Sequence, residues 1–186
     1  MTIDERIEAA EALFREGYNC AQCVVAVFAD HYGISRETAL RMSAGFGAGI
    51  GRMRLTCGTA CGMFMLAGLE HGATEGCDQK AKAHTYKVVQ QLAARFENEC
   101  GSLVCAELLG LRGGRHTDTQ PAQRTPEYYA GRPCLRMIAT SVRIFAEYLD
   151  SLEKEKREKP LEYFCSATIR TYTPRWPTDC VIWGTK

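Results

Sequence analysis

Ten cysteines among 186 residues are the side chains with the greatest capacity for chemistry in this sequence. Thiolates bind metals, hold iron–sulfur clusters and exchange with disulfides. The densest group is RLTCGTACGMFM, in which Cys57 and Cys61 lie four residues apart, and Cys20 and Cys23 form a C-x-x-C upstream. Because a chain of this length buries a hydrophobic core without disulfides, the cysteines indicate metal or redox chemistry rather than a disulfide scaffold.

The position of each cysteine relative to the predicted helices separates the ten into two groups. Four are expected at helix N-termini: Cys20 after the cap Asn19, Cys57 after the cap Thr56, Cys105 in the turn after Ser102, and Cys134 after Pro133. Unpaired N–H groups and the positive end of the helix dipole lower a thiol's pKa there and favour the thiolate. Thiolates bind metal, and amides that point at an anionic cluster stabilise it. If the four helix ends converge, these residues are a candidate cofactor and metal site.

The other six cysteines have no such position. They are Cys23 and Cys61, one turn further into their helices, Cys100 at a helix C-terminus, Cys77 in a loop, and Cys165 and Cys180 near the end of the chain. Taken singly, each is interpreted as a small buried hydrophobe or an incidental surface thiol. As pairs, Cys20/Cys23 and Cys57/Cys61 still form a competing set of four thiols, which leaves cluster-free dithiol chemistry open.

Helical periodicity and capping residues predict the elements that position the cysteines. The expected helices cover approximately 3–16, 20–32, 36–44, 57–71, 78–99, 103–109 and 133–159, with a surface loop over 112–127. The glycine run GFGAGIG reads as a loop that allows close backbone approach, and it lacks the spacing of a phosphate-binding loop. Arg52 and Arg54 follow it, either as exposed loop residues or as charges that balance a cluster. We therefore predict an all-α fold, a compact bundle of about six or seven helices over 1–159, with an irregular C-terminal tail of unknown role over 160–186.

Charge and hydropathy exclude several function classes. A formal net charge of +1 provides no basic field for nucleic acid. No apolar run approaches the roughly 18 residues that a membrane-spanning helix needs. The N-terminal stretch MTIDERIEAAEALF has neither a basic n-region nor an apolar h-region. We therefore expect a cytoplasmic protein without nucleic-acid binding or membrane insertion.

The cysteines and their surroundings resemble the C_GCAxxG_C_C family of redox proteins. The resemblance rests on Cys57-Gly58-Thr59-Ala60-Cys61-Gly62 after GFGAGIGR, on NCAQ at Cys20, on CAELLG at Cys105 and on RPCLRMI at Cys134. It covers about residues 1–152, with Thr59 in place of the alanine of the motif, and the tail lies outside the pattern. The resemblance implies a helical domain with a redox role.

The chain is also similar to the cluster-bearing domain of split-Soret cytochromes. That similarity implies a [2Fe-2S] cluster on four cysteines and a homodimer, whereas the haem part does not apply because no C-x-x-C-H occurs. The leading hypothesis is a cytoplasmic iron–sulfur protein for electron transfer or redox sensing, with an unidentified redox partner protein. Its cluster ligands would be Cys20, Cys57, Cys105 and Cys134. A cluster-free thiol–disulfide oxidoreductase and a zinc-stabilised or cofactor-free assembly domain stay open, and no catalytic residue is assigned.

Overall fold

The computed structural model describes residues 1–111 and 117–158. Its helices are α1 (Ile3–Arg15), α2 (Cys20–Ala26), α3 (Arg36–Ser43), the 3-10 turn η1 (Ala44–Phe46), α4 (Gly58–His71), α5 (Gln79–Cys100), α6 (Cys105–Leu108), α7 (Pro126–Ala130) and α8 (Cys134–Glu158). The described ranges contain no β-strand, only an isolated bridge between Thr56 and Val104. The predicted all-α fold is confirmed, whereas the expected tail and its boundary lie outside the described residues.

The helices begin where the sequence places capping side chains. Thr2 and Glu5 form a reciprocal capping box at the start of α1, and Asn19 forms another with Gln22 at the start of α2. Asp78 caps α5 by accepting the Ala81 N–H at 2.9 Å. Each cap satisfies backbone donors that have no partner within their own helix, which fixes the residue at which the helix starts.

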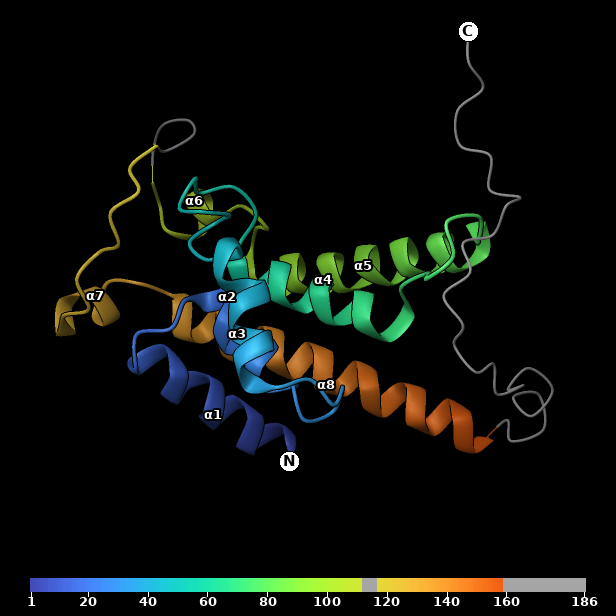
Figure 1. The fold of residues 1–186 in the computed structure, drawn as a ribbon. Coiled ribbons are helices and arrows are strands. Elements are labelled where there is room, and N and C mark those ends of the chain that lie inside the picture. The colour runs from blue at the N-terminus through green and yellow to red at the C-terminus, as the bar shows by residue number, and fades with distance from the viewer. Residues whose placement is uncertain (112–116, 159–186) are drawn as a thin grey trace, which may run out of the picture.

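The helices are arranged around α8, which lies between α1 on one side and the α4–α5 pair on the other (Figure 1). α2 crosses the bundle and packs against α1, α4 and α8. The core includes the fully buried rings of Phe28 and Phe145, whose centroids lie 5.1 Å apart in an edge-to-face arrangement. None of the described helices combines the length and apolar character needed to cross a bilayer.

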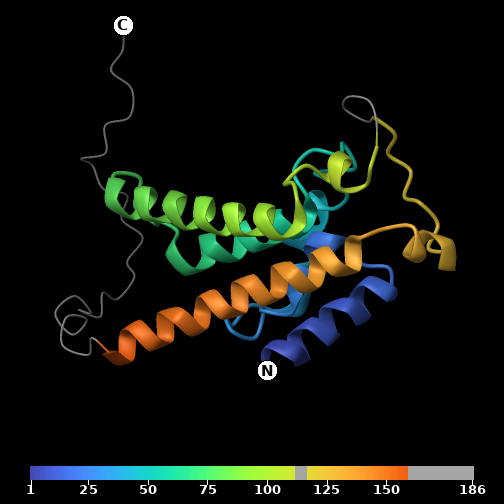
Figure 2. The same cartoon turned by 180° about the vertical axis from the view of Figure 1, so that it is seen from behind.

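Four helices begin at the same end of the bundle. The views from both sides show α2, α6 and the first turns of α4 and α8 at the same end (Figures 1 and 2). The opposite end holds the C-terminus of α8 and the connection between α4 and α5. The N-termini of these four helices, which are the positive ends of their dipoles, therefore lie in one region of the molecule.

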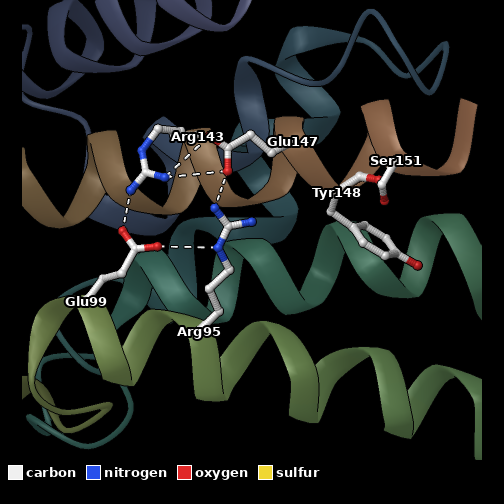
Figure 3. Close-up of polar contacts among 6 residues, drawn as sticks. All are labelled: Arg95, Glu99, Arg143, Glu147, Tyr148 and Ser151. Carbon is white, nitrogen blue, oxygen red and sulfur yellow. Dashed lines mark hydrogen bonds and ion pairs between the residues drawn. The ribbon is translucent and has the colours of Figure 1, made fainter. Parts of the chain in front are cut away.

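A closed ring of four charged side chains joins α5 to α8 (Figure 3). Arg95 and Glu99 come from α5 and Arg143 and Glu147 from α8, and each arginine pairs with both glutamates. Further along α8, the Tyr148 hydroxyl lies 2.6 Å from a ring nitrogen of a histidine at the end of α4. The charged ring and the Tyr148 hydrogen bond therefore connect α8 to α5 and to α4.

The ring makes a testable contribution to stability. The Arg95 guanidinium, which bonds directly to Glu147, lowers the pKa of that carboxyl, so the stabilisation exists above the ordinary glutamate pKa and is lost as pH falls through the lowered value. Because the ring is partly exposed and screened, we expect Glu147→Gln to cost only about 0.5 kcal/mol at neutral pH. Urea unfolding of wild type and Glu147→Gln at pH 7 and pH 3 measures the difference in the free energy of unfolding. The difference from wild type should become smaller from pH 7 to pH 3, and Glu155→Gln, outside the ring, should show no such pH dependence.

Candidate metal and redox site

The four cysteines expected at helix N-termini all lie there. Cys20, Cys105 and Cys134 are the first residues of α2, α6 and α8. Cys57 is itself the N-cap of α4, so this helix starts one residue later than the sequence suggests, and the expected cap, Thr56, lies outside it. The four thiols thus approach the same end of the bundle from four separate helices.

A cavity of about 50 Å³ is lined by all four of these cysteines. Cys20, Cys57 and Cys105 are buried, and Cys134 is half-buried. The two dithiol partners, Cys23 and Cys61, do not line the cavity. The remaining lining residues are Phe14, Asn19, Ala48, Arg54, Thr59, Leu108, Leu109, Arg124, Tyr128, Arg132, Pro133 and Met137. This wall therefore carries three arginines and no acidic side chain.

Backbone pairing brings two of the cysteines together. The Cys57 N–H donates to the Leu103 carbonyl at 2.7 Å, and the Cys105 N–H donates to the Leu55 carbonyl at 2.7 Å. These two bonds flank the isolated antiparallel bridge. Because the bridge fixes the register of both segments, the starts of α4 and α6 cannot slide relative to one another without breaking it.

Close packing of α2 on α4 positions a third cysteine. A Cβ atom at Gly58 would lie 2.5 Å from Cys20 Sγ, and one at Gly62 would lie 3.0 Å from Val24 Cβ. Only glycine leaves room for this approach. The two glycines of the motif therefore determine how near Cys20 comes to Cys57.

The glycine run forms a turn of left-handed backbone beside the cavity. All five residues from 48 to 52 have positive φ, including the non-glycine residues Ala48, Ile50 and Arg52. A Cβ at Gly49 would lie 2.6 Å from Cys105 Cβ, so the backbone of the turn packs closely against that cysteine. The Ala48 backbone N–H bonds to Cys20. The predicted loop with close backbone approach is confirmed, and its left-handed conformation was not foreseen.

Two polar side chains contact the cysteine sulfurs directly. The Thr59 hydroxyl lies 3.3 Å from Cys57 Sγ, and Thr59 is fully buried. Arg54 Nη1 lies 4.0 Å from Cys105 Sγ, and Arg54 is also buried. The Arg54 guanidinium donates to its sulfur, and the Thr59 hydroxyl can donate to Cys57 once that thiol is ionised, an arrangement that stabilises negative charge on a ligand.

A third polar group comes from a segment that sequence reasoning treated as a surface loop. The Arg124 guanidinium stacks over Phe14 at 4.5 Å and over Tyr128 at 4.7 Å, and its Nη2 donates to the Tyr18 carbonyl. Its Nη1 is buried without a hydrogen-bond partner in the described part of the chain. The sequence analysis also missed α7, which begins at the end of this expected loop (Pro126–Ala130). Its signal is Thr125 followed by Pro126, an N-cap and a proline at N1.

Burial favours the protonated thiol at Cys20, Cys105 and Cys134. Burial, with the neighbouring Cys57 as a smaller cause, raises the pKa of Cys134 to about 11 and also raises the pKa values of Cys20 and Cys105. The expectation that the helix N-termini lower these values is wrong for the protein as it stands, because desolvation is the larger effect. A bound metal reverses this balance, since it replaces the thiol protons.

The donor set and its surroundings fit an anionic, sulfur-ligated group. Four thiols, the unpartnered Arg124 Nη1 and the glycine cradle at Gly58 all border the cavity or its wall. Among the described residues, however, no three potential ligands are grouped closely enough to hold a metal ion. The four cysteines thus line one cavity without forming a site for a single metal ion within the described part of the chain.

Comparison with known proteins matches residues 18–148 to the family described as "Putative redox-active protein (C_GCAxxG_C_C)". The matched segment contains all four cavity cysteines and ends within α8. Comparisons with curated proteins and with solved structures find no significant match. Because the match spans well over half of the 186 residues, the chain belongs to the C_GCAxxG_C_C family.

Proposed function

We propose that this protein binds a [2Fe-2S] cluster through Cys20, Cys57, Cys105 and Cys134 and that it transfers single electrons or senses redox state. The observation that carries the proposal is the cavity that these four thiols share. Two irons with bridging sulfides need four thiolates arranged around a small volume. A homodimer and a cytoplasmic location stay predictions, as does the redox partner protein.

The dithiol alternative has less support from the geometry. Cys23 lies behind the cavity, fully buried, and burial raises its pKa to about 12. Burial likewise raises the pKa of Cys61 to about 11. Disulfide exchange begins with an accessible thiolate, so both residues are poorly suited to attack a substrate disulfide.

The charge of the cavity wall favours an anionic occupant. Arg54, Arg124 and Arg132 line the cavity without an acidic residue among the lining side chains. Arg54 is buried and the other two are half-buried, and a buried guanidinium is costly unless negative charge compensates it. Four thiolates around two irons and two sulfides supply net negative charge, whereas a pair of neutral thiols supplies none.

The chain's own residues would perform three tasks. Cys20, Cys57, Cys105 and Cys134 release their protons and ligate, while Thr59 and the Ala48 amide donate hydrogen bonds to sulfur. The apolar wall, which includes Met137 and Leu108, limits water around the sulfurs. When bound, the cluster would supply one-electron chemistry: one electron arrives from a donor protein and leaves to an acceptor protein. Cys134, the half-buried member, lies on the side nearest solvent.

Metal analysis of protein purified without oxygen tests this proposal. We expect iron and acid-labile sulfide at about two each per chain, with a visible spectrum that bleaches on addition of dithionite. Zinc at about one per chain, with no colour, would contradict the proposal and support a closed Cys₄ site. Protein that stays free of metal and sulfide after anaerobic reconstitution would also contradict it and would favour the dithiol or cofactor-free alternatives.

A further inference from the structure

Arg54 is a buried charge whose conformation the surrounding backbone enforces. Its φ is 61°, in the left-handed region, which costs an arginine about 1 kcal/mol. A Cβ at Gly49 would lie 2.8 Å from Arg54 Cα, and the Arg54 carbonyl accepts the Ala106 N–H at 3.1 Å. The strained residue is thus clamped between the glycine turn and α6.

The clamp directs the guanidinium to one of the four thiols. Arg54 Nη1 lies 4.0 Å from Cys105 Sγ in the buried cavity wall. A guanidinium at this distance favours negative charge on the sulfur. Backbone strain at a site that points a cation at a ligand sulfur is typical of a functional constraint.

The neighbouring Arg52 has a similar backbone but a different environment. It also has positive φ, at 66°, yet its guanidinium pairs with Asp118 at 2.6 Å and does not line the cavity. The two arginines that the sequence could not distinguish therefore differ in role. Arg52 pairs with Asp118 in the segment that follows α6, and Arg54 contacts Cys105 in the cavity wall.

We propose that Arg54 is the positioning residue that supplies the counter-charge of the site and selectively stabilises its reduced, more negative state. This inference rests on the proposed function, because a one-electron reduction adds one negative charge to the occupied cavity. The electron comes from a one-electron donor, and no bond within the chain is made or broken. A fixed buried cation interacts more strongly with the more negative state, so it raises the reduction potential.

The test compares Arg54→Gln with Arg54→Lys and Arg52→Gln in anaerobically purified protein, by iron and sulfide content and by spectroscopic redox titration. We expect Arg54→Gln to weaken the reduced state about tenfold, a potential lower by about 59 mV for one electron, or to lose iron and sulfide. Arg54→Lys, which keeps the charge, should recover most of either effect. Arg52→Gln should match wild type.

Each contrary outcome identifies a different failure. If Arg54→Gln and Arg52→Gln both carry full iron and sulfide at the wild-type potential, the proposed role of Arg54 is wrong, while the proposal that the protein binds a cluster is supported. If both lower the potential equally, the effect is general surface charge, which also overturns the role of Arg54. A wild-type protein that binds no iron overturns the proposed function and this inference together.

Discussion

Replacing Gly58 by alanine is expected to destabilise the protein by about 3 kcal/mol and to displace Cys20 from the cavity. The added Cβ would lie 2.5 Å from Cys20 Sγ and 2.8 Å from the Phe46 carbonyl oxygen. Both neighbours are confined: Cys20 is the first residue of α2, and Phe46 belongs to η1. The Phe46 oxygen is backbone and cannot retreat without moving η1, and the Cys20 sulfur can yield only by leaving its place beside Gly58.

Gly68 provides the matched control in the same helix. A Cβ there would meet nothing within 4 Å, and glycine in a helix interior costs roughly 0.5–1 kcal/mol relative to alanine. Gly68→Ala should therefore stabilise the protein by about that amount. Urea or thermal unfolding of both variants and of wild type measures the two changes in stability. If Gly58→Ala unfolds at the same denaturant concentration as wild type, close contact between α2 and α4 does not hold this site together.

The sequence predicted most of the helices and the approximate position of their starts because local chemistry sets them, although it missed α7 and extended α2 beyond its end at Ala26. Side chains such as Thr2 and Asn19 satisfy the first N–H groups of a helix wherever they occur, so the helix boundary is a short-range property. The positions of Cys20 and Cys134 followed from those boundaries. Their gathering at one end was a hypothesis until the packing of the helices was known.

The conformation of the glycine run and the placement of Arg54 and Arg124 in the cavity wall could not be predicted from local sequence. Ala48 and Ile50 adopt left-handed backbone against their intrinsic preference, so tertiary contacts impose that turn. The direction of Arg54 depends on the same turn. Arg124 was hidden because a polar segment usually indicates solvent exposure, and only stacking on Phe14 brings it to the cavity.

Substitution of the cavity cysteines is expected to have the largest effect on metal content. Removing a ligand thiolate should lower bound iron and sulfide about tenfold or more, because even the groups that support a ligand change metal affinity by that factor. Cys57→Ala and Cys105→Ala remove the two sulfurs joined by the backbone bridge. Burial alone does not explain such a loss, since other cysteines of this chain are equally buried.

The chain supplies a control of matched burial for each of these variants. Cys100 is 8% exposed and Cys105 is 7% exposed, yet only Cys105 lines the cavity, and the same holds for Cys61 at 7% and Cys57 at 6%. Cys100→Ala and Cys61→Ala should therefore cost similar stability while keeping full iron and sulfide. If Cys61→Ala loses its iron and sulfide while Cys105→Ala keeps them, the competing set holds the metal. That set is Cys20, Cys23, Cys57 and Cys61. The comparison thus separates a cavity built from four helix starts from one built from two dithiol pairs.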